Sequence, residues 1–385
     1  MGVDFAVKEL FFPLLRSAVC GYTLTEAEME AVRGADAEKL RRLAETHALS
    51  HLLSYALDKN GLADAEGKNE IFMAAYRCEQ LNYELESLCA VLEDAKIPFI
   101  PLKGSVIRRL YPEQWMRNSG DIDVLVKESE LDAAITALVG TLGYEEGSRW
   151  THDVSLYSPS GVHVELHFNL VEDSYAQKSA DVLASVWESS FPASDGSFRL
   201  EMSDEMFYLY HIAHMAKHFE HGGCGIRPFI DIWVLENRVE YDRSKRDALL
   251  EAGGLLKFAE ACRKLTDYWF NGAAADSLTE QMAEFILRGG VYGSIENTFA
   301  AKKSAKGGRV GYILSRAFPS LSALQPRFPT LKKYPILLPV FWVYRVILMI
   351  KRGSTGSTAR ELKMATFISS EKAKSAAEFM EKIGL

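Results

Sequence analysis

The spacing of apolar residues changes twice along the chain, from helical to strand-like and back to helical. Up to about residue 95, apolar side chains recur every three or four positions, which is typical of helices that pack on a core. Between 96 and 200, short apolar or alternating runs are separated by helical stretches, and helical spacing returns after 201. We therefore expect an α+β protein in which a small mixed β-sheet is flanked by helical regions.

These changes also indicate where the parts of the chain begin and end. The N-terminal helices are predicted at 5–19, 25–32, 37–58 and 70–95. Thr25 and Glu28 form a capping-box pattern at the start of the second of them. We divide the chain into an N-terminal helical region (1–95), a mixed core (96–200), a helical subdomain (201–300) and a basic helical region (301–385).

Two carboxylates open the strand predicted at 121–126. Alternate residues of a strand point to the same face, so Asp121 and Asp123 project together while the apolar residues of the strand face the other way. Two such carboxylates repel one another unless a cation lies between them, and oxygen ligands suit Mg²⁺ or Mn²⁺, which also bind phosphates. The pattern therefore predicts a metal-bound nucleotide.

A glycine turn precedes this pair of acids. The apolar run 97–102 predicts a strand that ends near Gly104, where the missing Cβ lets backbone N–H groups approach a ligand. Ser105 then begins a helical stretch whose N-terminus favours anions, and Lys103 adds a positive charge. Alone, the turn or the acids would be unremarkable surface features, but their order and proximity favour a site.

A third carboxylate lies in the strand predicted at 162–168, where apolar and polar residues alternate strictly. His163, Glu165 and His167 therefore share one face of that strand. The alternative is the solvated face of an edge strand. If this face meets the other two acids, Glu165 completes a site with three carboxylates.

These motifs resemble the signature of the nucleotidyltransferase superfamily related to DNA polymerase β. The resemblance rests on the Gly104-Ser105 turn, the Asp121/Asp123 pair and Glu165 on a later strand. Fifteen residues lie between Ser105 and Asp121, more than is usual in that superfamily. The spacing implies a longer helix and loop over 106–120.

The chain resembles more closely the bacterial family of uncharacterised nucleotidyltransferases, over about residues 80–240. The segments that carry this similarity are Leu102-Lys103-Gly104, Tyr111-Pro112, Arg117 with Gly120-Asp121-Ile122-Asp123, and Glu165-Leu166-His167.

The resemblance implies transfer of a nucleoside monophosphate from a nucleoside triphosphate, with ATP as the expected donor, and release of pyrophosphate. Asp121 and Asp123 would hold two Mg²⁺ or Mn²⁺ ions, while Glu165 would complete the second ion site and help to remove the acceptor proton. The acceptor is a small molecule, a protein or an RNA. A nucleotide-binding module that has lost catalysis and regulates a partner is the alternative. The predicted nucleotide-binding residues are Lys103, Gly104, Ser105, Arg117, His167, His214, Lys217, His218, Arg227 and Asp231.

Four of the nine histidines fall on one line of the helix predicted after residue 203. They are His211, His214, His218 and His221, with Lys217 at the opposite edge of the line. Three interpretations remain open: a metal-dependent hydrolase site built on His211, His214 and His218, a hydrogen-bonded structural row, or a helix that lines the nucleotide cleft.

Gly222-Gly223 then ends this helix, and Pro228 suits the first turn of the next. Arg227 and Asp231 are spaced i, i+4 and are expected to pair. In the family resembled, Lys217-His218, Arg227 and Asp231 match recurring positions, which implies that they face the cleft. An ordinary surface pair is the alternative.

Charge is distributed unevenly along the chain. Residues 297–360 contain twelve Lys or Arg and no Asp or Glu, so the remaining residues carry a net charge of −20 against −8 for the whole chain. This basic segment could contact an anionic membrane or a nucleic acid, or pack on the acidic remainder of the chain. Its apolar part, 334–350, contains Pro335, Pro339 and Arg345 and is too short to span a bilayer.

The cysteines and the N-terminus indicate the compartment. The five cysteines show no paired spacing, so neither a disulfide framework nor a zinc site is expected. Asp4, Lys8 and Glu9 interrupt the apolar start, which does not have the layout of a signal peptide. We expect a cytoplasmic protein without a transmembrane helix, with peripheral membrane contact left open.

Overall fold

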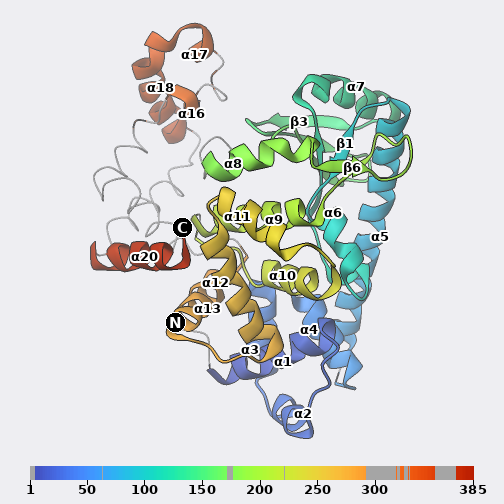
Figure 1. Ribbon diagram of the computed structural model, residues 1–385, viewed down its shortest axis with the longest axis vertical. Helices are drawn as coiled ribbons and strands as arrows, with labels where there is room; N and C mark the ends of the chain where they lie inside the picture. Colours follow the sequence, from blue (N-terminus) through green and yellow to red (C-terminus); the bar gives the residue numbers. More distant parts are fainter. Residues whose placement is uncertain are drawn as a thin grey trace.

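The computed structural model describes residues 5–62, 64–170, 177–220, 222–291, 318, 321–324, 328, 330–351 and 370–385. Figure 1 shows a mixed sheet surrounded by helices from both halves of the sequence. The predicted α+β class is confirmed.

Five helices form the N-terminal part of the chain. They are α1 (Phe5–Val19), α2 (Glu26–Arg33), α3 (Ala37–Thr46), α4 (Ser50–Lys59) and α5 (Ala65–Asp94). The capping box of Thr25 and Glu28 is present. The single helix predicted at 37–58 is wrong, because the chain turns at Ala48, whose φ is 53°. This turn lets both His47 and Leu49 reach the core, where each is fully buried.

The sheet has five strands in the order β1-β2-β5-β4-β3. Their bounds are β1 (Phe99–Pro101), β2 (Asp121–Val126), β3 (Glu145–Arg149), β4 (Asp153–Tyr157) and β5 (His163–His167). Only β2 and β5 are parallel to one another; the other neighbours are antiparallel. The register places His163 beside Asp121 and Glu165 beside Asp123, so the acids of both strands lie on one face.

The other face of the sheet is apolar and covered. Ile122, Val124 and Leu166 belong to a core cluster that also contains the inner faces of α5 and α7 (Leu131–Leu142). Helix α7 follows the short 3₁₀ turn η3 (Glu128–Glu130). Because one face is buried in this way, the polar face is left for chemistry.

The segment 106–120, for which a longer helix and loop was implied, contains less helix than expected. Helix α6 (Gly104–Ile107) is a single turn, followed by the 3₁₀ turns η1 (Arg108–Leu110) and η2 (Gln114–Met116). Pro112 lacks a backbone N–H and cannot continue a helix. Arg108 Nε donates to the Gly104 carbonyl at 2.8 Å, which ties the buried Arg108 side chain to the start of the short helix.

The second half of the chain is mainly helical. Its elements are α8 (Gln177–Leu183), η4 (Ala184–Trp187), β6 (Ser190–Pro192), β7 (Leu200–Met202), α9 (Asp204–Glu220), α10 (Arg227–Arg238), α11 (Arg243–Ala252), α12 (Leu256–Thr266), the π turn η5 (Asp267–Asn271) and α13 (Ser277–Gly289). A large core cluster joins these helices to α1, α3 and α4. Phe12 of α1 stacks on Trp269 with ring centroids 4.8 Å apart.

The described C-terminal elements are α16 (Leu321–Leu324), α17 (Thr330–Lys333), η6 (Pro335–Leu337), α18 (Leu338–Lys351) and α20 (Ser370–Ile383). Among the described residues, none of the helices has the length and apolarity needed to cross a membrane. Much of the basic segment 297–360 lies outside the described residues, as does His221. All five cysteines are free thiols.

Candidate active site

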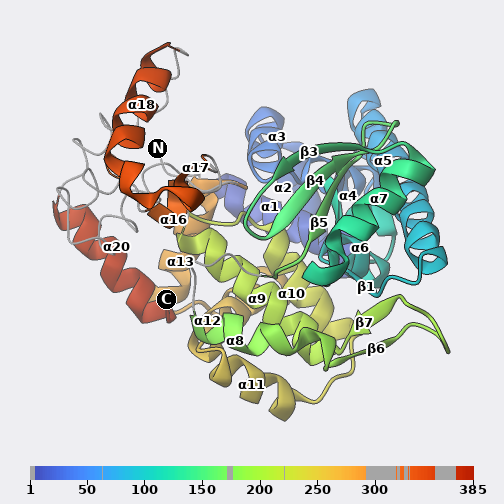
Figure 2. The same ribbon diagram turned by 90° about the horizontal axis from the view of Figure 1, so that it is seen from above.

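A cavity of about 910 Å³ lies between the polar face of the sheet and helices α9 and α10. In Figure 2 these helices run beside the sheet, although they come from a distant part of the sequence. The predicted site residues that line the cavity are Lys103, Gly104, Arg117, Asp121, Asp123, Glu165, His167, His211, His214, Lys217, His218, Arg227 and Asp231. Ser105 is buried and does not line the cavity.

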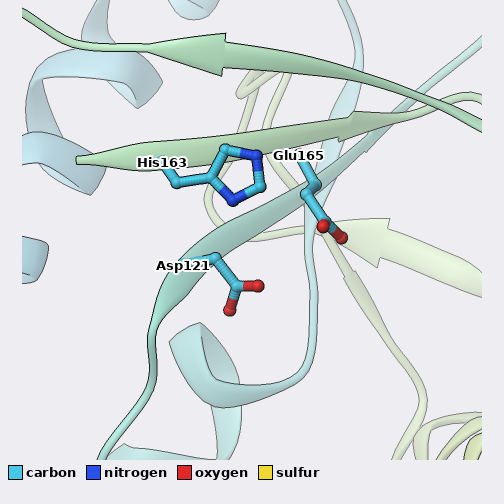
Figure 3. Close-up of side chains that lie close together, drawn as sticks. All are labelled: Asp121, His163 and Glu165. Carbon is cyan, nitrogen blue, oxygen red and sulfur yellow. The ribbon is translucent and has the colours of Figure 1, made fainter. Parts of the chain in front are cut away.

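The sheet brings the three predicted acids together. Two groups of potential metal ligands share Glu165, one with Asp121 and His163 and the other with Asp123 and His167. Within each group the ligand atoms lie within 4.8 Å of one another. Figure 3 shows Asp121 on β2 facing His163 and Glu165 on β5. Carboxylate oxygens and imidazole nitrogens are suitable donors for a divalent cation, so the residues fit a metal site.

Lys103 lies directly against this cluster. Its Nζ is 2.6 Å from Asp123 Oδ1 and 3.9 Å from Glu165. His167 Nε2 is 2.9 Å from the same oxygen of Asp123 and 3.4 Å from Glu165. The ammonium thus neutralises part of the negative charge that a cation would otherwise offset.

These contacts separate the acidities of the two aspartates. Burial alone would raise the pKa of Asp123, but Lys103 and His167 outweigh it and hold that pKa well below the usual range. Burial, together with the charge of Asp123, raises the pKa of Asp121. Burial disfavours the charge of Lys103, but Asp123 more than offsets this and raises the Lys103 pKa. The charged forms of Asp123 and Lys103 therefore stabilise each other.

Gly104 makes room for a neighbour in the same turn. A Cβ at this position would overlap the hydroxyl of Ser119, which belongs to the loop before β2. The missing side chain therefore lets the turn and the loop approach closely. This close packing is a structural reason for glycine that does not depend on a ligand.

Two guanidinium groups lie on the helical side of the cavity. Arg117 Nε bonds to Asp231 at 2.7 and 3.0 Å, and Arg227 Nη1 donates to the Asn118 carbonyl at 3.0 Å. The expected ion pair between Arg227 and Asp231 is thus wrong, because Arg117 takes the carboxylate. The nearby charge of Arg117 lowers the pKa of Arg227 to about 10. Two cations crowded in this way favour an anion between them.

Comparison with known families agrees with this geometry. The family described as uncharacterised nucleotidyltransferase matches residues 33–271, which is more than half of the chain. The chain belongs to this family. No curated protein and no solved structure matches the chain. The residues that match the family include every strand of the five-stranded sheet as well as α9 and α10.

The histidines of α9 have separate surroundings in the nucleotidyltransferase cavity. His211 Nε2 lies 3.0 Å from the Pro228 carbonyl, and the His214 and His218 rings meet through nitrogens 3.0 Å apart. Burial lowers the pKa of both His211 and His214. No group of three potential metal ligands among the described residues includes any of them. The contacts favour a hydrogen-bonded row that lines the cavity.

Sequence reasoning missed Asp153 and His152 of the nucleotidyltransferase cavity. Asp153 is buried, stands beside His167 in the β4–β5 register, and lies 3.1 Å from His152 Nε2. Burial raises the pKa of Asp153. The sequence contains a signal for them, because the Ser158-Pro159-Ser160-Gly161 turn pattern between two strand-like runs predicts a hairpin, which brings the start of one strand beside the end of the next.

Proposed function

We propose that this nucleotidyltransferase moves a nucleoside monophosphate from a nucleoside triphosphate, with ATP as the expected donor, to an acceptor hydroxyl. The observation that carries the proposal is the convergence of Asp121, Asp123 and Glu165 in one cavity that also has cationic side chains. This arrangement of acids is the one expected from the resemblance to the nucleotidyltransferase superfamily related to DNA polymerase β.

Asp121 and Asp123 would hold two Mg²⁺ or Mn²⁺ ions, and Glu165 would complete the second ion site. When bound, such ions neutralise the phosphates and make the acceptor hydroxyl more acidic. Glu165 is partly exposed to the cavity, so its carboxylate can accept the acceptor proton.

The triphosphate would lie toward Lys103, Arg117 and Arg227. Arg117 is held by Asp231 and is less than a tenth exposed, so its guanidinium is fixed in place before a nucleotide arrives. A fixed cation costs less entropy to use than a mobile one. Lys217 and the histidines of α9 line the same side of the cavity and would contact the phosphates or the base.

In the proposed reaction one bond to the α-phosphorus forms and one breaks. The acceptor oxygen forms a new ester bond to the α-phosphorus, the bond between the α- and β-phosphates breaks, and pyrophosphate leaves. The hydroxyl proton passes to Glu165 and then to solvent. The site residues position the reacting groups and offset their charge, and no covalent intermediate with the protein forms. Any acceptor hydroxyl could use the three acids, so the other residues of the cavity select the acceptor.

The test offers each nucleoside triphosphate to the purified protein in a cell extract, labelled either at the α- or at the γ-phosphate, with Mg²⁺ or Mn²⁺. Transfer of the α-label with release of pyrophosphate is expected. Asp123→Asn should reduce it at least about 100-fold, because it removes a ligand charge. The control, Asp132→Asn, changes an exposed carboxylate away from the cavity and should leave it unchanged.

Two results would contradict the proposal. Transfer of the γ-label would indicate a phosphotransferase. Nucleotide binding without any transfer, in every extract tried, would favour the regulatory module instead.

A further inference from the structure

The two groups of potential metal ligands differ in the contacts that their ligand atoms already make. In the group of Asp123, Glu165 and His167, the Lys103 ammonium and His167 Nε2 both contact the same oxygen of Asp123. Lys103 and His167 also lie within 4 Å of Glu165. A cation that enters this group has to displace the ammonium first.

The group of Asp121, His163 and Glu165 is open by comparison (Figure 3). One ring nitrogen of His163 lies within 4.8 Å of a carboxylate oxygen of Asp121 and of one of Glu165. The His163 ring stacks on Tyr157, with centroids 5.0 Å apart and planes 24° apart, which fixes its orientation. An oriented ring nitrogen beside two carboxylates has the features of a metal ligand.

The nitrogen donor decides which ions fit. Mg²⁺ is bound by oxygen ligands and gives up water reluctantly, whereas Mn²⁺ and Zn²⁺ accept imidazole together with carboxylates. A site made only of carboxylates would have no such preference against Mg²⁺. His163 therefore changes the selectivity of this position.

We propose that Asp121, His163 and Glu165 bind one divalent transition-metal ion, of the Mn²⁺ or Zn²⁺ class, in preference to Mg²⁺ and without nucleotide. Lys103 keeps the neighbouring position closed until a nucleotide draws its ammonium toward phosphate. The inference deepens the proposed function, since it concerns the ion site on which that function rests.

The experiment titrates Mn²⁺ or Mg²⁺ into the metal-free, full-length protein by calorimetry, with no nucleotide present. One Mn²⁺ per chain is expected, with Mg²⁺ at least about tenfold weaker. Lys103→Met removes the competing ammonium and should raise the stoichiometry from one to two. Equal affinity for the two ions in the unchanged protein would overturn the proposal.

Two variants at one position separate a lost ligand from a lost fold. His163→Ala should weaken Mn²⁺ binding at least about tenfold. His163→Asp supplies a third carboxylate, so it should still bind a divalent ion but lose the preference for Mn²⁺ over Mg²⁺. His152→Ala, a histidine of the same cavity outside both groups, is the matched control and should keep both affinity and preference.

The outcomes distinguish this inference from the proposed function. If His163→Ala binds Mn²⁺ as tightly as His152→Ala does, the ion position is wrong even when α-label transfer is observed. If Mn²⁺ binds as expected but no nucleotide is transferred, the ion position stands and the proposed reaction fails.

Discussion

Lys103 has a backbone conformation that suits glycine better than lysine. Its φ of 46° and ψ of −121° are costly for any residue with a Cβ. The side chain compensates through its ion pair with the buried Asp123. The ion pair with Asp123 therefore offsets the energetic cost of this backbone conformation.

Comparison of two substitutions separates these effects. Lys103→Ala and Lys103→Gly both leave Asp123 without its ammonium, but only glycine relieves the strain. We expect the glycine variant to be more stable than the alanine variant by about 1 kcal/mol, measured by urea unfolding. A more stable alanine variant would show that residue 103 is not strained.

His51 links stability to pH. It is buried, its Nε2 lies 3.0 Å from the Met116 carbonyl, and burial lowers its pKa to about 4. The unfolded chain takes up a proton near pH 6.5, whereas the folded chain does so only near pH 4. The contribution of His51 to the free energy of unfolding should therefore be complete above pH 6.5. It should be lost as the pH falls toward 4, by up to about 1.4 kcal/mol per pH unit.

His51→Gln tests this assignment, because glutamine can still donate to the Met116 carbonyl but does not titrate. Its free energy of unfolding, measured by urea titration at several pH values, should depend less steeply on pH between 6.5 and 4. An unchanged slope would assign the effect to other groups.

At the scale of elements, one buried network ties the loop before β2 to α10. Asp231 accepts bonds from Arg117 and from the Tyr111 hydroxyl, the latter at 2.7 Å, and is fully buried. Burial alone would raise the Asp231 pKa, but Arg117 outweighs it and lowers that pKa. Removal of either charge leaves the other buried without its charged partner.

Asp231→Asn should therefore reduce the free energy of unfolding by about 3–5 kcal/mol, and Tyr111→Phe by about 1–2 kcal/mol. The control is Glu30→Gln, which removes an exposed i, i+3 pair with Arg33 and should cost at most about 0.5 kcal/mol. Urea unfolding measures all three. Similar losses for Asp231→Asn and Glu30→Gln would rule out the network's role.

The same network shows how far sequence patterns reach. Local sequence patterns were enough to predict α1, the capping box at Thr25 and the shared face of His163, Glu165 and His167. The partner of Asp231 was not predictable, because Arg117 is 114 positions away and only the tertiary fold brings the two together. Helical spacing likewise said nothing of the turn at 47–49, which depends on which residues the core receives.

The site divides in the same way. The spacing of Asp121 and Asp123 identified two acids on one face, but the parallel register of β2 and β5 decides that His163 lies next to Asp121. Register between distant strands depends on the whole sheet and not on either strand alone. The position of Lys103 against Asp123 was missed for a similar reason, because the motif had suggested phosphate as its only partner.

At the scale of the whole molecule, α1 is part of a core that extends to the far end of the matched family region. Phe12 stacks on Trp269, and Trp269 in turn meets Phe229 of α10 edge-on at 5.2 Å. Family similarity begins only at residue 33, yet these contacts join the preceding helix to the elements that line the cavity. We expect α1 and these helices to unfold together.

Phe12→Ala should cost about 3–5 kcal/mol by opening a cavity beside Trp269, and calorimetry should show a single transition shifted to lower temperature. Phe72→Ala is a matched control, since Phe72 is 65% exposed on α5 and should cost little. A separate early transition in Phe12→Ala would mean that α1 unfolds on its own.

The sheet's two outer strands are protected in different ways. On one side, β1 is continued by the β6–β7 hairpin, through a bridge between Phe99 and Arg199. On the other side, β3 is exposed at every residue and carries Glu145, Glu146 and Arg149. A second chain that paired with β3 would have to remove water from these charges, so they protect this edge of the sheet against pairing between chains.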